Sequence, residues 1–438
     1  MVSIHSASLA GNPVALRLLK LFVLQLFIKV SRLVTFLRIN FGRPRSLWGV
    51  TPIHTINLNA KCDEKLGFKS RSLVFVQYFI SKNFSYNFSK ILQLIQAQNS
   101  GMEKPFYWLV FLYCLLRYDN FNFFYDRGIF PSDKGRGINE FELKILKAAG
   151  KRIFVYPYGG DVRVRQTTLD LGQFNCCMDC DRIAWHCICS KDLASANVEI
   201  ISKYANAIIG MGDMSLYTPG SYDFQFWPIE PENYENVSSI RRDKSQALRI
   251  LHAPNHSQFK GTAYFEKAVK KLQENGYRVD YRKIEKLANN LVIQEMMQAD
   301  IIFDQLINGF HGYTTVESMA LGRPVICFIR DETMVPNWEN CPILCGSPSN
   351  IYELLLACIE GELDLENIGA QSRAYAEKYY SLDAVALNMC DLYLERGGYP
   401  PRLKEKIEAK KIELKYKIEA VEVAHSSGPY FHASATVD

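Results

Sequence analysis

The residues best suited to chemistry lie between positions 304 and 325, where an apolar segment is followed by a loop and then by a helical pattern. The loop carries Gly309 and Gly312, and a glycine lets the backbone come close to a ligand. We expect the helix to begin near Thr314, so that the amides at its start face outward at the positive end of the helix dipole. These amides belong to Tyr313, Thr314 and Thr315. The pattern predicts a site for a phosphate or a diphosphate.

A carboxylate accompanies this loop. Glu317 lies about one turn into the helix, where it can accept two hydrogen bonds from a ribose diol. Taken alone, it would be an ordinary first-turn acid favoured by the helix dipole. A second loop, at 255–262, again leads from a strand into a helix, and its Lys260 can reach a diphosphate held across the strand ends. Together the two loops predict a ligand crevice that includes Asn255, Lys260, Gly261 and Glu317.

The segments Lys260-Gly261 and 317–325 (ESMALGRPV) resemble the donor-domain motifs of the GT-B glycosyltransferases, specifically the retaining enzymes of glycosyltransferase family four, of group 1 type. The resemblance extends over residues 248–395. It implies that Glu317 holds the ribose of a nucleotide sugar, that Lys260 and the loop amides from Gly312 onward hold its diphosphate, and that the turn at Ile284 lies beside the base. It makes Lys260 and Glu317 the catalytic candidates of this half.

One position departs from the family. The family's E-x7-E motif would place its first glutamate, which contacts the sugar, at Gly309. Asp304 or His311 could take over that contact. A sugar-nucleotide epimerase of the same fold and a catalytically silent, membrane-associated scaffold therefore stay open as alternatives.

The first half of the chain contains two weaker matches. Gly49, within Trp48-Gly-Val-Thr-Pro52, resembles the glycine loop after the first strand of GT-B acceptor domains. The segment 156–163 resembles the family's H-G-x-D element, with Tyr158 in place of the histidine. The acceptor-binding residues implied are Gly49, Gly160, Asp161 and Arg163, with Asp161 also a catalytic candidate. The alternative for this pair is a helix-capping aspartate beside a solvated arginine.

Twelve cysteines are present, and five of them fall within 176–189. The spacing of Cys177, Cys180, Cys187 and Cys189 would allow four thiolates to close a structural zinc site that pins an insertion at 176–189. The alternative is a reduced, loosely packed loop. The other cysteines are scattered, several in apolar runs, which favours free thiols in a reducing cytoplasm.

Alternating strand and helix patterns predict an α/β protein of two Rossmann-like halves. The family resemblance implies the GT-B architecture, in which two such domains face a cleft. Strands are expected at 71–80, 120–126, 152–158 and 206–211, and then at 248–254, 277–284, 300–306 and 324–329. The predicted organisation is a basic segment at 1–45, an acceptor domain at 46–228, a linker at 229–247, a donor domain at 248–395 and a helical tail at 396–438.

The net charge of +5 is unevenly distributed. Residues 1–62 contain eight Lys and Arg side chains and no acid, so the remainder is slightly acidic. A basic working face for nucleic acid is therefore not expected. Within 14–39, Leu19, Leu26, Val30, Leu33 and Leu37 lie opposite a polar side that includes Lys20, Lys29 and Arg32. This pattern predicts a helix lying in an anionic membrane surface. A solvated docking helix is the alternative.

These features combine into one expectation. The protein is interpreted as a cytoplasmic glycosyltransferase, peripheral on the inner face of the cytoplasmic membrane, that moves a hexosyl group from a UDP- or GDP-sugar with retention. The acceptor would be a lipid-linked saccharide of surface polysaccharide or glycan assembly. No catalytic metal is expected, because Lys260 and the helix dipole would neutralise the leaving diphosphate.

Overall fold

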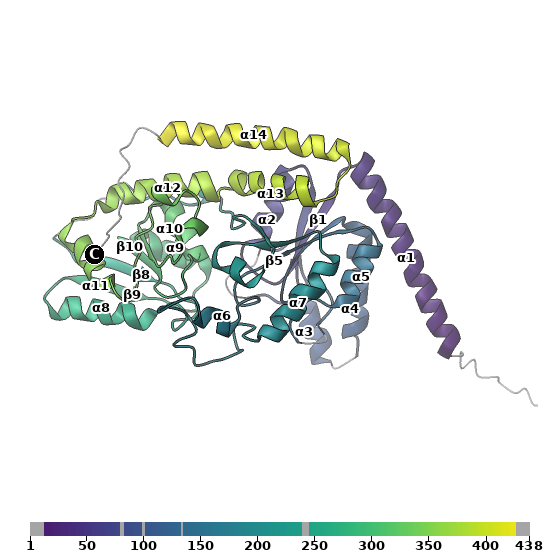
Figure 1. Ribbon diagram of the computed structural model, residues 1–438, viewed down its shortest axis with the longest axis horizontal. Coiled ribbons are helices and arrows are strands. Elements are labelled where there is room, and N and C mark those ends of the chain that lie inside the picture. Colours follow the sequence, from purple (N-terminus) through teal and green to yellow (C-terminus); the bar gives the residue numbers. More distant parts are fainter. Residues whose placement is uncertain (1–12, 79–82, 99–100, 133–134, 239–244, 426–438) are drawn as a thin grey trace, which may run out of the picture.

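The computed structural model describes residues 13–78, 83–98, 101–132, 135–238 and 245–425. Its strands form two separate parallel sheets, one in each half of the chain (Figure 1). The helices α2 to α7 accompany the first sheet and α8 to α12 the second. The α/β architecture and the two-sheet arrangement expected from the sequence are confirmed.

The first sheet has seven strands in the order β3-β2-β1-β4-β5-β6-β7. Its centre is apolar on both faces, as expected for a parallel sheet covered by helices, and Trp48, Phe121 and Phe154 are fully buried. The strands are β1 (Arg45–Val50), β2 (Lys69–Val74), β3 (Tyr86–Asn87), β4 (Asn120–Phe124), β5 (Arg152–Tyr156), β6 (Ala207–Gly210) and β7 (Tyr222–Asp223). The helices are α2 (Ile56–Lys65), α3 (Ser89–Ala97), α4 (Glu103–Arg117), α5 (Glu140–Ala148), α6 (Arg165–Leu169) and α7 (Lys191–Tyr204).

The second sheet has four strands in the order β11-β10-β8-β9. Its strands are β8 (Leu248–His252), β9 (Val279–Lys283), β10 (Ile301–Gln305) and β11 (Val325–Cys327). Its helices are α8 (Thr262–Glu274), α9 (Asn289–Gln298), α10 (Tyr313–Leu321), α11 (Ile351–Glu360) and α12 (Leu365–Tyr380). The central strands β8 and β10 carry the loops predicted to bind a ligand, because parallel strands present their carboxyl ends at the same edge.

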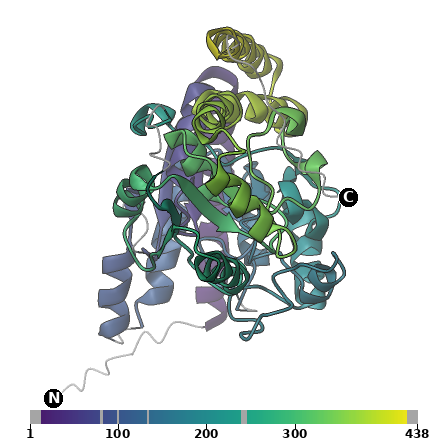
Figure 2. The same ribbon diagram turned by 90° about the vertical axis from the view of Figure 1, so that its left-hand side faces the viewer.

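The chain then returns to the first half. Helix α13 (Leu382–Arg396) packs on α2, where the Tyr393 hydroxyl donates to Asp63 at 2.5 Å and Lys65 pairs with Asp383 at 2.6 Å. Helix α14 (Pro401–His425) lies along α13 and α12 and buries Leu403, Ile407 and Leu414 (Figures 1 and 2). The predicted end of the second domain at residue 395 thus falls within a helix that packs against the first half.

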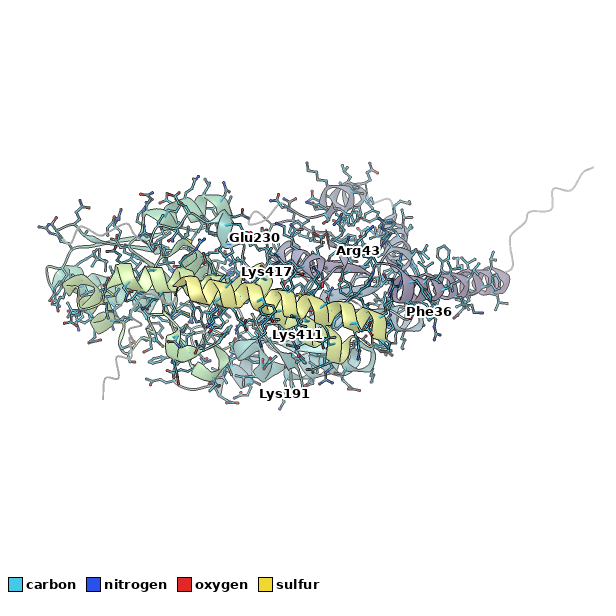
Figure 3. The ribbon with its side chains drawn as sticks, turned by 90° about the horizontal axis from the view of Figure 1, so that it is seen from above. Phe36, Arg43, Lys191, Glu230, Lys411 and Lys417 are labelled. Carbon is cyan, nitrogen blue, oxygen red and sulfur yellow. The ribbon has the colours of Figure 1, made fainter. Side chains whose placement is uncertain are left out.

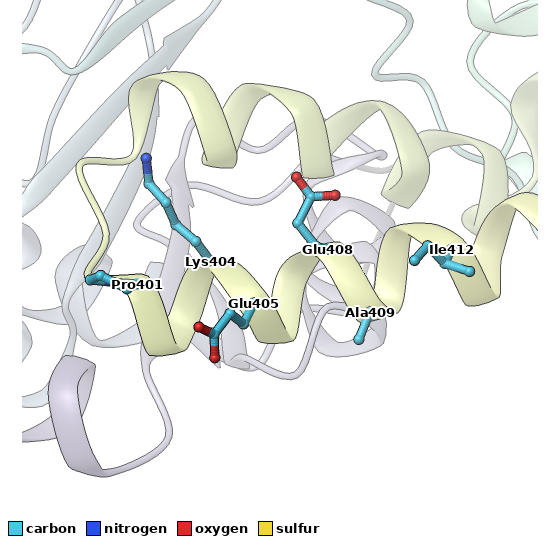
Figure 4. Close-up of a pocket in the computed structure, with 6 residues that line it drawn as sticks. All are labelled: Pro401, Lys404, Glu405, Glu408, Ala409 and Ile412. Atoms are coloured by element: carbon cyan, nitrogen blue, oxygen red, sulfur yellow. The ribbon is translucent and has the colours of Figure 1, made fainter.

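The outer side of α14 carries a shallow hollow (Figure 4). Its lining is Pro401, Lys404, Glu405, Glu408, Ala409 and Ile412. All six belong to α14, so this hollow contains none of the residues predicted to bind a ligand.

Helix α1 (Pro13–Phe41) docks on α4 and α5 through a mixed face, in which Ile28 and Ile39 are buried together with Ser31 and Thr35. Ser31 Oγ donates to the Leu115 carbonyl at 2.6 Å, and Thr35 Oγ1 accepts from the buried Lys151 amine at 2.5 Å. Near the end of the helix, Arg38 pairs with Asp119 at 2.9 Å. Part of the predicted polar face is therefore buried, because these side chains find partners in the body of the protein.

Helix α1 lies at the edge of the molecule (Figure 1), and its side opposite the docked face exposes apolar residues. The exposed fractions are 57% for Leu19, 51% for Leu26 and 59% for Leu33. Phe36, labelled in Figure 3, is 55% exposed. Among the described residues, no helix is both long and apolar enough to cross a membrane.

Candidate functional site

The site in the second half begins with Lys260, which follows β8. The chain turns at Gly261, the N-cap of α8, with φ of +70°, a conformation that favours glycine. The Lys260 carbonyl accepts from the Leu306 amide at 3.0 Å, which joins this loop to the end of β10. The Lys260 ammonium donates to Asp304 Oδ1 at 2.5 Å. The predicted loops after β8 and β10 are therefore brought together as one unit.

Helix α10 begins at Tyr313, with Gly312 as its N-cap. The Gly312 amide donates to Asp304 Oδ2 at 2.6 Å, and Thr315 Oγ1 donates to the same oxygen at 2.7 Å. A Cβ on residue 312 would lie 2.9 Å from the Lys260 nitrogen, so glycine leaves the room that this amine occupies. Tyr313 and Thr314 occupy the first turn, where helix geometry leaves amides without an intrahelical acceptor.

Glu317 is only 4% exposed and lies one turn into α10. Its Oε1 accepts from the Asn289 side chain at 2.7 Å and from the Tyr234 hydroxyl at 3.4 Å. Burial raises the pKa of Glu317 to about 7, against the opposing effect of these two hydrogen bonds. Asn289 opens α9 and Tyr234 lies in the segment between the sheets, so neither partner could be found from a local motif.

The remaining residues predicted for this site lie around it. Asn255 is exposed in the loop after β8, and Ile284 follows β9, where its amide donates to the His252 carbonyl at 2.9 Å. Tyr313 reaches away from the first turn, and its hydroxyl donates to the Pro228 carbonyl at 2.8 Å. From the first half, the centre of the His54 ring lies 5.4 Å from that of the Tyr313 ring.

Gly309, which stands where the family has a glutamate, has φ of +86°. A Cβ there would meet the Arg330 guanidinium, which donates to the Asn308 carbonyl at 3.2 Å and to the Phe174 carbonyl at 2.8 Å. Arg330 follows β11 and was not identified from the sequence. Its guanidinium fills the space into which a side chain at this position would extend.

His311 cannot replace the missing glutamate in this arrangement. It is 2% exposed, and its Nε2 shares a hydrogen bond of 2.8 Å with the Tyr380 hydroxyl. Burial lowers its pKa to about 4, so the imidazole is neutral. The interpretation of His311 as a sugar contact is therefore not supported, and Asp304 is already bonded to Lys260 and α10.

In the first half, both predicted glycines lie in close contact with neighbouring backbone. Gly49 lies within β1, and a Cβ there would clash with the Leu73 carbonyl oxygen of β2. Gly160 packs on the cysteine-rich segment, where a Cβ would come 2.5 Å from the His186 carbonyl oxygen. Close backbone packing explains why both positions hold glycine, and their assignment to the acceptor site stays a prediction.

Asp161 and Arg163 also differ from expectation. Asp161 is buried and accepts from the amides of Tyr158, Gly159 and Tyr125 at 2.9, 3.0 and 3.2 Å. Burial raises its pKa to about 8. Arg163 pairs with Asp213 at 2.6 Å, both side chains being 6% exposed. Their charged groups are engaged inside the first half, and Arg163 is not solvated as the alternative had it. Their roles in catalysis and acceptor binding stay predictions.

A different set of polar residues lies at the carboxyl edge of the first sheet. Thr51 follows β1 and donates to Asp126 Oδ1 at 2.5 Å, and Asp126 follows β4. The Tyr158 hydroxyl, after β5, is 3.4 Å from Asp126 Oδ2. Since Asp126 ends the predicted strand 120–126, strand-end polar residues were the signal that would have identified this group.

The cysteine-rich segment does not form the predicted zinc site. Over the described residues, which include all twelve cysteines, no three Cys, His, Asp or Glu side chains gather as a metal site would require. The Cys189 sulfur accepts from the Ala184 amide at 3.3 Å. The four thiols Cys177, Cys180, Cys187 and Cys189 therefore do not converge.

This segment instead contacts the second half. The His186 ring lies 3.8 Å from that of His256, in the loop that leads to Lys260. The Arg163 guanidinium lies 5.1 Å from the centre of the Phe259 ring in the same loop. The loop after β8 is thus supported from the first half as well as from β10.

Solved structures share this architecture. HepE (Alr3699) of Anabaena in complex with UDP-glucose aligns with a TM-score of 0.50 at 10% identity, covering 80% of this chain and 99% of that one. The same protein with UDP and glucose aligns with a TM-score of 0.50 at 11% identity, and the alignment covers 81% of this chain and 100% of that one. Sucrose-phosphate synthase of Thermosynechococcus elongatus aligns with a TM-score of 0.46 at 10% identity, covering 81% of this chain and 98% of that one. No family model matches the chain, and no match was found among curated proteins.

Over most of both chains this protein shares its fold with HepE, and that fold is the GT-B fold, which takes its name from a group of glycosyltransferases. Both sheets are parallel, the residues of the predicted donor site follow strands of the second sheet, and the C-terminal helices return to the first half. The expected fold and the resemblance to this group of enzymes are therefore confirmed.

Proposed function

We propose that this protein is a glycosyltransferase that takes a sugar from a nucleoside diphosphate sugar, with UDP- and GDP-sugars as the candidate donors. The observation that carries the proposal is the common position of Lys260, the first turn of α10 and Glu317 beside the carboxyl ends of β8 and β10. A cation and a helix N-terminus suit a diphosphate, and a carboxylate one turn further suits a ribose diol. The UDP and UDP-glucose complexes of HepE agree with this class of donor.

In this proposal the chain acts mainly by stabilising the leaving group. As the bond between the sugar and the diphosphate breaks, negative charge grows on the diphosphate, and Lys260 and the α10 dipole offset it. No metal ion is required for that role. Transfer of a hexosyl group with retention follows the family resemblance. On the acceptor side we assign three residues of the first half, Thr51, His54 and Asp126.

We further propose that the acceptor is a lipid-linked saccharide of polysaccharide or glycan assembly and that the enzyme works on the inner face of the cytoplasmic membrane. The support is helix α1, on which apolar residues such as Leu19, Leu26 and Leu33 are exposed. Its polar residues Ser31, Thr35 and Arg38 are held by α4, Lys151 and Asp119. The exposed cations Lys20, Lys29 and Arg32 border this apolar face. Such a helix suits an anionic lipid surface.

Binding of UDP, GDP and their sugars to the full chain, measured by calorimetry, tests the donor. We expect one of the two nucleotides to bind and Glu317→Ala to weaken it by about tenfold to a hundredfold, the effect of losing a charged hydrogen bond. Binding of neither nucleotide would contradict the proposal. The two alternatives differ in what happens to the nucleotide sugar after it binds. An epimerase would convert it to its epimer without any acceptor, and a silent scaffold would leave it intact.

Sedimentation with anionic vesicles tests the membrane surface. Leu26→Glu with Leu33→Glu places two charges on the exposed face of α1 and should abolish co-sedimentation. Ile412→Glu is a matched control, since Ile412 is an exposed apolar residue of α14, with 57% of its surface accessible. Equal sedimentation of the α1 variant and the control would refute the proposed membrane contact.

A further inference from the structure

The donor groups predicted to hold a diphosphate converge on a side chain of the protein itself. Asp304 Oδ1 accepts from the Lys260 ammonium at 2.5 Å, and Oδ2 accepts from the Gly312 amide at 2.6 Å and the Thr315 hydroxyl at 2.7 Å. The Asp304 side chain is 1% exposed. One buried carboxylate therefore takes hydrogen bonds from a lysine, a helix N-cap and a hydroxyl, which are the kinds of donor that bind phosphate.

The ionised state of Asp304 follows from these contacts. Burial alone would raise its pKa, but the Lys260 charge and the hydrogen bonds from Lys260, Thr315 and Gly312 hold it below the ordinary value. A negative charge thus lies at the entrance of α10 before any ligand arrives. It cancels the Lys260 charge and opposes the positive end of the helix dipole.

The two partners differ in their freedom to move. The Lys260 side chain is 17% exposed and carries three donor hydrogens, so its ammonium can turn toward a ligand. Asp304 is held at the end of β10 by Gly312 and Thr315, so its carboxylate stays in place. Any diphosphate held by Lys260 and α10 would lie near a second, fixed negative charge.

We propose that Asp304 is a built-in counter-charge that competes with the diphosphate for Lys260 and the α10 N-terminus, and thereby limits how tightly the nucleoside diphosphate product is held. This inference rests on the proposed donor site. It gives Asp304 a positioning and affinity-setting role, distinct from a contact with the sugar. Such a residue favours release of the product, because the carboxylate regains its partner when the diphosphate leaves.

The test compares nucleoside, nucleoside monophosphate and nucleoside diphosphate binding to wild type and to Asp304→Asn, with the base that wild type prefers. Removing the charge should tighten diphosphate binding by about tenfold or more and leave nucleoside binding unchanged, since Coulomb repulsion acts on the phosphates alone. Asp304→Ser repeats the test with a smaller neutral residue that can still accept from Gly312. Thermal melting establishes that each variant is folded.

Asp300→Asn is the matched control. Asp300 lies just before β10, at the other end of that strand, is 6% exposed and pairs with Arg249 at 2.8 Å. Its replacement removes a buried charge from the same strand without touching the site, so the ratio of diphosphate to nucleoside affinity should not change.

A double-mutant cycle measures the coupling between Lys260 and Asp304 in diphosphate affinity, and a purely structural role of Asp304 would not produce such a coupling. Lys260→Ala should cost more diphosphate affinity in the Asp304→Asn background than in wild type, because the ammonium then has no internal competitor. Weaker or unchanged diphosphate binding in folded Asp304→Asn and Asp304→Ser, or an equal cost of Lys260→Ala in both backgrounds, overturns the inference. If wild type binds no nucleotide, the proposed function fails first, which is a separate outcome.

Discussion

Two buried carboxylates, one in each half of the molecule, show how similar sequence signals lead to different roles. Asp161 follows β5 and Glu317 lies in α10, and burial raises their pKa values to about 8 and about 7. Asp161 accepts from three backbone amides of its own half. Glu317 accepts from two side chains, Asn289 and Tyr234. A ligand hydroxyl can replace a side-chain donor, whereas the backbone amides around Asp161 are part of the fold.

The basic partners repeat this contrast. Arg163 forms its ion pair with Asp213 with both side chains 6% exposed, and it faces the rings of Tyr217 and Phe259. Lys260 also pairs with an aspartate, yet its side chain keeps 17% of its surface accessible. The first pair stabilises the structure, and the second pair leaves one member able to reach a ligand.

The largest expected effect is on the pair in the first half. Arg163→Ala should lower the free energy of unfolding by about 3–5 kcal/mol, because Asp213 is left buried without its cation. Denaturant unfolding measures this change. Adding Asp213→Ala should recover part of the loss. A loss below about 1 kcal/mol would remove the distinction between the two basic residues.

Asp161→Ala should be the next most damaging change, at about 3 kcal/mol, since three amides lose their acceptor. Near pH 5, where Glu317 is protonated in the folded state, Glu317→Ala should change stability by less than about 1 kcal/mol, because its partners lie beside the proposed ligand crevice and can be solvated. The two unfolding curves, measured side by side, test the comparison. Equal losses would show that Glu317 is as structural as Asp161.

A smaller effect concerns pH. The folded pKa of Glu317, about 7, lies above its ordinary value of 4.5. The folded state therefore binds more protons between these values, and the contribution of Glu317 to stability falls as pH rises from about 4.5 to 7. Relative to wild type, Glu317→Gln should gain stability over this range. A difference between the two proteins that does not vary with pH would contradict the raised pKa.

The same pKa applies to the ligand. A nucleotide sugar should bind more weakly at pH 6 than at pH 8, by up to about tenfold, because a protonated Glu317 accepts fewer hydrogen bonds from a ribose. Glu317→Gln should remove this dependence. Calorimetry with the sugar nucleotide, whose phosphates do not titrate in this range, provides the measurement.

The donor half was predictable because its signals are local. Lys260-Gly261, Gly312 and Glu317 lie within short segments that join a strand to a helix, and the strand ends bring them together. Asp304 was considered only as a replacement for the family's missing glutamate, because its bonds to Lys260 and Thr315 depend on the packing of two loops.

The first half was less predictable, since its partners are distant in sequence. Arg163 meets Asp213 fifty residues later, and Asp161 meets the Tyr125 amide from another strand end. The docking of α1 depends in the same way on Lys151 and Asp119. The separation of apolar and polar residues on α1 was clear from the sequence. Which side of the helix faces the protein, however, is decided by these distant groups.

Sugar transfer is the most direct test of the central claim. Radiolabelled UDP- and GDP-sugars would be incubated with a bacterial lipid extract and either wild type or Glu317→Ala, and the label in the lipid fraction would be counted. The account predicts label transfer from one of the two donor classes by wild type and a loss of at least about tenfold in the variant. No transfer to lipid, or transfer unaffected by the substitution, would contradict it.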